Sequence, residues 1–394
     1  MPKRKWLPIL LIGLAVLAIL VGVGAYLVST YVVVVPDPFV PKQPVTTLGP
    51  AAATFAPGEL KKTTVTAHLG APIEKDRNLL YCATAQLAWN ELCKLAGGPV
   101  KLSGNPPAAA ALNRREVTRA DLDEASLVAV AGFGGPALAK KIRAEIAAKQ
   151  AITAAPRQLG PIDALPPGEL AAYCLLAKGL PFEWAFDRQY GMAFAGEQVQ
   201  NWGIHQYTDS EEREKKAAAQ LHLYDYKSKD DFILEIDTRS KSDQLILAKV
   251  PPAPTLKKLV EAVSARMAAS KPETGMDNLA NMEVPIIDFD VAHDFAELSG
   301  KRITAPGSKA NGKQLAVARQ AVRFRLDERG VTLFGEMVIV TCISEQRDFI
   351  FDEPFLVMIR KRNSKLPYFA LWVANGELLA KKAPEPSGPA LERP

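Results

Sequence analysis

The chain has 394 residues, of which 48% are apolar, and a formal net charge of +5. This length suits one large domain or two ordinary ones, and the apolar fraction allows a sizeable core. A net charge this small on a chain this long argues against a nucleic-acid-binding protein, so we expect no nucleic-acid partner.

An uncharged apolar run occupies residues 6–35. It is longer than the roughly 20 helical residues that cross a bilayer core. Because Lys3, Arg4 and Lys5 precede it, we expect residues 1–5 in the cytoplasm, a single-pass transmembrane helix, and the remaining chain outside. A cleaved signal peptide is the alternative, although its apolar region usually has only about 7–15 residues.

The segment after this run, residues 36–58, is rich in Pro and Ala and predicts an extended stalk. We expect a globular, extracytoplasmic domain over residues 59–380. The last segment, 381–394, is rich in Pro and charge and predicts a disordered tail.

The chain has four cysteines, Cys82, Cys93, Cys174 and Cys342. An even count outside the cell permits disulfides. Cys82 and Cys93 are expected about 16 Å apart on one helix face, which is too far for a bridge. The dispersed spacing has no C-x-x-C pair and predicts no zinc site, so buried free thiols are the favoured interpretation.

Helices are predicted mainly in the first half of the domain. Apolar residues at helical spacing predict a buried helix over 78–98, which Gly97 and Gly98 would end. A second helix is expected over 136–149, with Pro136 in its first turn. Charges at i and i+4 within 211–216 predict a solvated helix face.

From about residue 219 the pattern changes to strands. One more helix is expected over 255–267. Helices followed by concentrated strands predict an α+β domain. The expected strands cover residues 221–226, 231–237, 244–250, 321–327, 332–340, 355–359 and 368–373.

Two glycine-containing motifs resemble phosphate-binding elements but lack their context. Residues 307–314, GSKANGKQ, fit a phosphate loop up to Lys313, but Gln314 stands where a magnesium-binding hydroxyl is needed. Residues 127–146 are similar to one helix-hairpin-helix unit. One copy in an extracytoplasmic domain is more simply a Gly-rich link into a helix.

No enzyme motif is present in the local sequence, and the four histidines share no ligand spacing. We expect no enzymatic activity, no catalytic residue, no metal and no cofactor. An enzyme of unrecognised type would need a concave site, with Asp288, Asp290 and His293 as the nearest candidates.

The stretch FLVMIRKRNSKLPYFALWV, residues 355–373, predicts a hairpin of two buried strands around a polar turn. Together with Pro354 it resembles the C-terminal end of the serpins, "PFLFFIR" followed by a "PLFMG" strand. Ala370 and Leu371 stand where that family usually has glycine.

Other serpin-like pieces follow in family order. Residues 172–187 resemble "ANAIYFKGKWxxPFD", and residues 243–263 resemble "LSMVILLP" followed by a helix. Residues 281–300 are similar to "VEVSLPKFxLExxYDLxxxLxxLG". The resemblance covers 172–376 and, more weakly, 78–150. It implies a serpin-like domain with three sheets and a helical bundle.

The resemblance also implies a reactive loop around residues 331–350, entered through a hinge. Glu328 and Gly330 match the start of the hinge, and Val331 replaces its threonine. Gly335 is the one small residue where the family has a run of them. The family count places the scissile bond between Ser344 and Glu345.

Residues 331–340 are rich in β-branched and large apolar side chains, which favours a permanently paired strand. A mobile loop would expose Phe334, Val338 and Ile339 to water. We therefore expect a membrane-anchored, non-inhibitory binding or structural module with an unidentified protein partner. The alternative is a serpin-type inhibitor whose partner is a protease.

Overall fold

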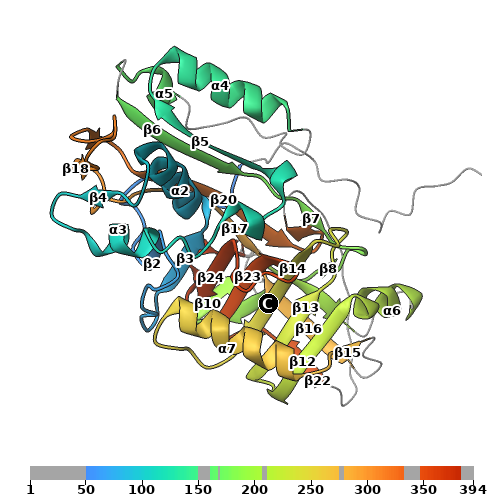
Figure 1. The fold of residues 1–394 in the computed structure, drawn as a ribbon. Helices are drawn as coiled ribbons and strands as arrows, with labels where there is room; N and C mark the ends of the chain where they lie inside the picture. Colours follow the sequence, from blue (N-terminus) through green and yellow to red (C-terminus); the bar gives the residue numbers. More distant parts are fainter. Residues whose placement is uncertain are drawn as a thin grey trace, which may run out of the picture. The chain divides into compact units, whose positions relative to one another are not determined.

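The computed structural model describes residues 50–149, 160–166, 169–205, 211–274, 279–331 and 347–382. These residues form an α+β unit built mainly from strands, as the sequence predicts (Figure 1). The predicted transmembrane helix over 6–35 lies outside the described residues. Within the described ranges, every helix is too short or too polar to cross a bilayer.

The largest sheet has eight strands in the order β15-β12-β13-β14-β23-β24-β3-β2. Every residue of β14 and of β24 is buried, which fits their apolar runs at residues 245–248 and 369–373. The strands are β2 (Thr63–Thr66), β3 (Asn78–Cys82), β12 (Leu221–Ser228), β13 (Asp231–Ile236), β14 (Asp243–Lys249), β15 (Glu273–Thr274), β23 (Phe355–Lys361) and β24 (Phe369–Val373).

The predicted C-terminal hairpin is confirmed, because β23 and β24 pair from Phe355↔Val373 to Ile359↔Phe369. Its polar turn does more than face water. Lys361 donates to the carbonyls of Ala120 and Leu122, and Arg362 pairs with the buried carboxylate of Glu235. The charged turn therefore fastens the hairpin to neighbouring segments.

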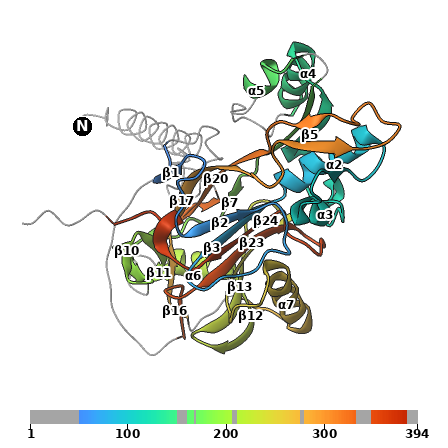
Figure 2. The same cartoon turned by 90° about the vertical axis from the view of Figure 1, so that its left-hand side faces the viewer.

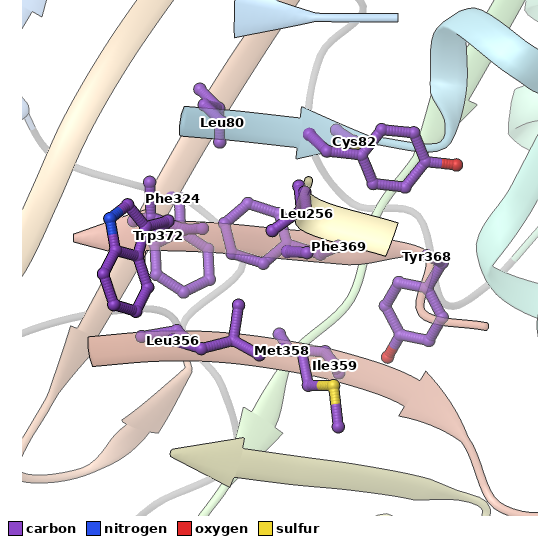
Figure 3. Packing of buried hydrophobic residues seen from close by; sticks show 14 of the residues in the cluster. Leu80, Cys82, Leu256, Phe324, Leu356, Met358, Ile359, Tyr368, Phe369 and Trp372 are labelled. Carbon is purple, nitrogen blue, oxygen red and sulfur yellow. The ribbon is translucent and has the colours of Figure 1, made fainter. Parts of the chain in front are cut away.

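A five-stranded sheet, β1-β17-β20-β21-β7, packs against this hairpin. The rings of Phe324 in β20 and Phe369 in β24 stack with centroids 4.2 Å apart, which joins the two sheets (Figure 3). The strands are β1 (Ala53–Phe55), β7 (Leu180–Pro181), β17 (Ile287–Asp294), β20 (Arg319–Asp327) and β21 (Gly330–Val331).

β5 (Leu127–Phe133) and β6 (Leu170–Leu176) form a separate antiparallel pair. Helix α2 (Thr84–Ala96) contacts both strands and belongs to the main core. Helix α4 (Pro136–Ala147) joins Val128, Val130 and Tyr173 of these strands in a second apolar cluster. The pair is therefore covered by a helix from each core (Figure 1).

Three smaller sheets complete the described unit, in the orders β22-β16-β11-β8, β10-β9 and β19-β18-β4. Their strands are β4 (Lys101–Leu102), β8 (Asp187–Arg188), β9 (Met192–Phe194), β10 (Glu197–Val199), β11 (Asn201–His205), β16 (Leu279–Pro285), β18 (Lys301–Thr304), β19 (Gln314–Leu315) and β22 (Arg347–Ile350). The other helical segments are α3 (Pro107–Leu112), α5 (Gly160–Asp163), α6 (Glu211–Ala219), α7 (Leu256–Ala269) and the single turns Arg119–Asp121, Glu124–Ser126 and Gly376–Leu378.

The prediction of one helix over 78–98 is wrong for its first residues. Residues 78–82 form strand β3, and the helix begins only at Thr84. Leu79, Leu80 and Tyr81 are all buried between β2 and β24, so this segment has no polar face to give helical periodicity. Because Cys82 lies in a strand, the predicted separation of Cys82 and Cys93 along one helix face does not apply.

The thiols of Cys82, Cys93 and Cys174 are free, which agrees with the interpretation of unpaired cysteines. Cys342 lies outside the described residues. Burial raises the pKa of the Cys82 and Cys174 thiols, so both resist ionisation and the oxidation that depends on it.

The remaining helix predictions are confirmed with shifted ends. Helix α4 ends at Ala147, and α7 runs from Leu256 to Ala269 behind the N-cap hydroxyl of Thr255. Residues 211–216 lie in α6, where Glu212 and Lys216 form the predicted i,i+4 ion pair. The predicted strand 332–340 lies outside the described residues, and the other predicted strands are present.

The long helices α2, α4 and α7 contact strands, and they lie on different parts of the unit (Figure 2). These three helices therefore do not form the bundle that the resemblance implies. The phosphate-loop-like segment 307–314 is the connection between β18 and β19. It turns at Gly307 and Gly312, which both have positive φ.

The folded unit extends past both predicted boundaries. Residues 53–55, assigned to the stalk, pair in parallel with β17 at Phe289–Val291. Lys381, assigned to the tail, bridges to Val199, and Leu379 bridges to Ile287. Both ends of the described chain therefore rest on or beside β17.

Candidate functional site

The segment that resembles a serpin hinge enters a sheet. β20 and β21 are antiparallel and are joined by a tight turn, with Leu326 opposite Val331 and Asp327 opposite Gly330. On its other side, β21 pairs with β7, so that Gly330 lies opposite Pro181 and Val331 opposite Leu180. The two described residues of β21 are thus hydrogen-bonded to a strand on each side.

Buried charges fix the turn before β21. The carboxylate of Asp327 is fully buried and accepts hydrogen bonds from Arg325 Nε at 2.7 Å and from the backbone N–H of Arg329 at 3.0 Å. The carbonyl of Arg329 accepts from Phe182 N at 2.9 Å, and that of Glu328 from Phe186 N at 2.8 Å. Every residue of the turn is therefore anchored.

Gly330 is required by this geometry for two reasons. Its φ of +126° is a conformation that side-chain-bearing residues rarely adopt. A Cβ there would lie 2.4 Å from the carbonyl oxygen of Leu180 and 2.8 Å from the backbone nitrogen of Phe182. The absence of a side chain is what lets β7 approach the turn.

Glu328 is the unusual residue of the site. Its side chain is only 6% exposed, yet neither carboxylate oxygen has a hydrogen-bond partner. The nearest cation is Arg329, with Nε 3.6 Å from Oε1. Burial, with a smaller contribution from the neighbouring Asp327, raises the pKa of Glu328. The turn therefore carries a carboxylate that costs stability when it is ionised.

We expect Glu328→Gln to raise the free energy of unfolding at neutral pH by about 1–3 kcal/mol, because the amide keeps the shape of the side chain but removes its buried negative charge, and burying a charge costs more than burying a neutral polar group. Folding raises the pKa of Glu328 above its ordinary value of 4.5. Its carboxylate therefore destabilises the folded state at pH values above the raised pKa, and it has no such effect at pH values below 4.5. Wild-type stability should fall as pH rises through this window, and the variant should lack that fall.

The measurement is denaturant unfolding of both proteins across the pH range 4–8. Glu353→Gln, which replaces an exposed glutamate, serves as the control and should leave the profile unchanged. Parallel pH profiles for wild type and Glu328→Gln would contradict the prediction, because they would show that ionisation of Glu328 does not lower the stability of the fold.

Three aromatic rings pack together next to the turn. Phe182, Phe186 and Trp202 are buried, with ring centroids 4.9–5.3 Å apart. Two of them, Phe182 and Phe186, are the residues whose N–H groups bind the turn carbonyls. The hinge-like turn therefore rests on a rigid aromatic support.

The chain that follows the predicted reactive loop is also held in place. β22 pairs in parallel with β16, and the N–H of Phe351 donates to the Glu283 carbonyl at 2.9 Å. Phe349 and Phe351 are fully buried and each lies with its ring centroid 5.1–5.2 Å from that of Phe232. The chain thus returns into the main core by residue 349.

Lys249 holds the segment around residues 350–352 in place. Its side chain is 3% exposed and donates to the carbonyl of Ile350 at 3.0 Å and to Asp352 at 2.6 Å. A second carboxylate, Asp230, lies 2.8 Å away. The buried ammonium is fully paired, so it acts as a structural clamp between β14 and the segment after β22.

The residues considered for an enzyme do not converge. Asp288 is buried and pairs with Arg323 at 2.5 Å, while His293 lies five residues further along β17, against the ring of Phe295. Five residues of strand separate these two side chains by about 16 Å and turn them to opposite faces. Asp290 shares the face of Asp288, and so the three form no common site.

Solved structures of serpins match this chain. Thyroxine-binding globulin in complex with thyroxine is 12% identical, with 75% of this chain and 92% of that chain covered and a TM-score of 0.45. Uncleaved ovalbumin is 13% identical, with the same coverage and a TM-score of 0.45. Native protease nexin-1 with heparin is 12% identical, with coverage of 76% and 92% and a TM-score of 0.44.

These proteins belong to the family that the sequence resembles, and at this identity the likeness concerns the fold alone. No protein-family model matches the chain, and no curated protein matches it by sequence.

The serpin resemblance located part of this site. Glu328, Gly330 and Val331 lie together at the turn and in β21, whereas Gly335, Ser344 and Glu345 lie outside the described residues. The resemblance missed Lys249, which nothing in its own strand distinguishes from a surface lysine. The aromatic spacing in LPFEWAF, residues 180–186, was a usable signal for the support beneath the turn.

Proposed function

We propose that this chain is a non-inhibitory, serpin-like binding or structural module. The observation that carries the proposal is the double pairing of Gly330 and Val331 with β20 and β7. An inhibitor of the family's type needs this part of the chain to change its pairing after cleavage. Here the first residues of the segment are already bonded on both sides.

The contacts around the turn support a fixed arrangement. Moving the turn would break the hydrogen bonds from Phe182 and Phe186 and would uncover the buried Asp327 with its Arg325 partner. In sequence, Leu333 and Phe334 stand where the family's hinge has small residues, which also disfavours free movement.

We further propose that the module is tethered to a membrane by residues 6–35 and lies on the extracytoplasmic side. The support is the uncharged apolar run preceded by PKRK. We assign it no enzymatic activity and no cofactor, and its partner would be a protein.

A serpin-type protease inhibitor is the alternative function. One observation favours it: Glu328 is buried without a hydrogen-bond partner at the position that matches the hinge. Withdrawal of the turn into water would relieve that cost, so the unpaired carboxylate could help to drive a rearrangement. The scissile bond would then be Ser344–Glu345.

Limited proteolysis of the full-length chain separates the two functions. For a fixed module we expect a panel of proteases to leave residues 331–350 intact. For an inhibitor, a cut near Ser344 should raise the thermal stability of the domain or trap a protease in a covalent complex. Cut sites are mapped by mass spectrometry, and stability is followed by thermal unfolding. Either sign of inhibition would overturn the proposed function.

A further inference from the structure

A short segment crosses from the edge of the main sheet to helix α7. Residues 67–73, which we call the strap, follow β2 and lead toward β3. The N–H groups of Leu256 and Lys257, in the first turn of α7, donate to carbonyls of the strap at 3.1 and 2.7 Å. In return, the N–H of Ile73 donates to the carbonyl of Pro254 at 3.2 Å. The strap is therefore hydrogen-bonded to the start of α7 in both directions.

The strap also covers part of the apolar core. Its residues Leu69 and Ala71 are buried, and they belong to the same apolar cluster as Leu256 of α7. Moving the strap away from α7 would bring these side chains into contact with water. The closed strap therefore shields an apolar surface that the chain presents only when the strap is displaced.

His68 is the one ionisable side chain of the strap. Its Nδ1 is buried and has no hydrogen-bond partner. Of the histidines whose side chains the structure describes, only His222 forms an ion pair with a carboxylate. The imidazole of His68 therefore has no directly bound acceptor that would stabilise its protonated form.

Two cations already share one carboxylate beside His68. Nε of Arg114 lies 3.1 Å from Oε1 of Glu116, and Nζ of Lys257 lies 2.7 Å from the same oxygen. Nδ1 of His68 and Nη2 of Arg114 both lie within 3.5 Å of the position that a Cβ on Gly70 would take. The imidazole and the guanidinium are therefore close neighbours. Protonation of His68 would add a third positive charge beside a carboxylate that is already shared.

One more charged group acts on His68, the carboxylate of Glu297 in the turn after β17. The pKa of His68 is lowered from its ordinary value of 6.5, first by burial and then by Arg114, and the carboxylates of Glu116 and Glu297 oppose this only in part. Closure of the strap is therefore favoured while His68 is neutral. It is weakened as the pH falls from 6.5 toward the lowered pKa.

We propose that the strap opens in acid and that His68 is the residue that senses the pH. At neutral pH the uncharged imidazole lets the strap dock on α7. In acid, protonation adds a charge that is relieved when His68 moves into water, away from Arg114. Opening then uncovers the apolar side chains of Leu69 and Ala71. The proposal does not depend on the proposed function, because none of these residues belongs to the hinge-like turn.

The test is hydrogen exchange of the full-length chain at pH 7.5 and pH 5.5, with the intrinsic exchange rates corrected at each pH. We expect the protection of the Ile73, Leu256 and Lys257 amides to fall about tenfold in acid, since a pKa lowered by one unit changes the closing equilibrium tenfold. The amide of Phe351, which donates to Glu283 outside the strap, should lose no protection. An equal loss at Phe351 would show a general loosening and would overturn the proposal.

Three variants identify the sensor. His68→Gln keeps a polar side chain but cannot take up a proton, so the strap amides should have the same protection at both pH values. Arg114→Gln removes the neighbouring cation and leaves Glu116 free to stabilise the protonated imidazole, so the acid effect should shrink although His68 is present. His222→Gln is the matched control. It removes a histidine of β12 that pairs with Asp237, and it should leave the acid effect on the strap unchanged.

The variants also decide the result if one of them disturbs the strap. A full acid effect in His68→Gln would overturn the proposal. If His68→Gln opens the strap at both pH values, Arg114→Gln gives the answer instead. An acid effect as large in Arg114→Gln as in wild type would mean that the charge beside His68 is not the cause, and the proposal would be wrong.

Discussion

Replacing Gly203 with alanine is expected to produce the largest loss of stability of any conservative change in the described chain. A Cβ at this position in β11 would lie 1.5 Å from the carbonyl oxygen of Met282 in β16. The oxygen belongs to the backbone, and the position of a Cβ is fixed by the backbone that carries it, so no side-chain rotation can relieve the contact. We expect the free energy of unfolding to fall by about 3–5 kcal/mol, measured by denaturant unfolding.

The control for this change is Gly98→Ala, since a Cβ there meets nothing within 4 Å. It should alter stability little. The disruption caused by Gly203→Ala should begin at the β11–β16 pair, which lies in the middle of the sheet β22-β16-β11-β8. A variant as stable as wild type would mean that β11 and β16 are further apart than described.

The change Gly330→Ala is expected to release the start of the hinge-like segment. The added Cβ would meet the backbone of Leu180 in β7 and of Phe182 just after it, and alanine would also have to adopt a φ of +126°. We expect a loss of about 3 kcal/mol from strain and overpacking together. Because the pairing with β7 is lost, new protease cuts should appear close to residue 330.

Gly307→Ala separates the effect of the positive φ from the effect of the close approach of β7. Gly307 also has a positive φ, +79°, but a Cβ there would meet nothing within 4 Å. It should cost only about 1 kcal/mol and create no new cut near residue 330. If Gly330→Ala is no worse than Gly307→Ala, β7 does not close on the turn, and the observation behind the proposed function is lost.

The strands of the second half were predictable because their signals are local. In β14 and β24 every residue is buried, and the apolar runs at residues 245–248 and 369–373 indicate this directly. The turn Asp327–Gly330 was also predictable, since it has a strong β-former on each side and a glycine at its end. The serpin resemblance then marked Glu328 and Gly330 as the residues to examine.

Other features depend on contacts that no local pattern records. Leu79, Leu80 and Tyr81 are consecutive residues that show neither helical nor strand periodicity, and only the neighbours β2 and β24 decide that they form a strand. Lys249 alternates like a solvent-facing residue, yet three groups distant in the chain enclose its ammonium. The burial of Glu328 likewise comes from β7 and the aromatic residues that follow it, which lie about 150 residues earlier in the sequence.

The position of both ends of the described chain beside one strand has a practical consequence. β1 lies beside Phe289 in β17, and Leu379 lies beside Ile287, two residues away. Ends this close favour circular permutation, because a short linker could join residue 382 to residue 50 without disturbing β17. New termini opened in the connection between β18 and β19 would move the attachment point to the opposite end of β17, and the same folded unit could then be mounted in a different orientation.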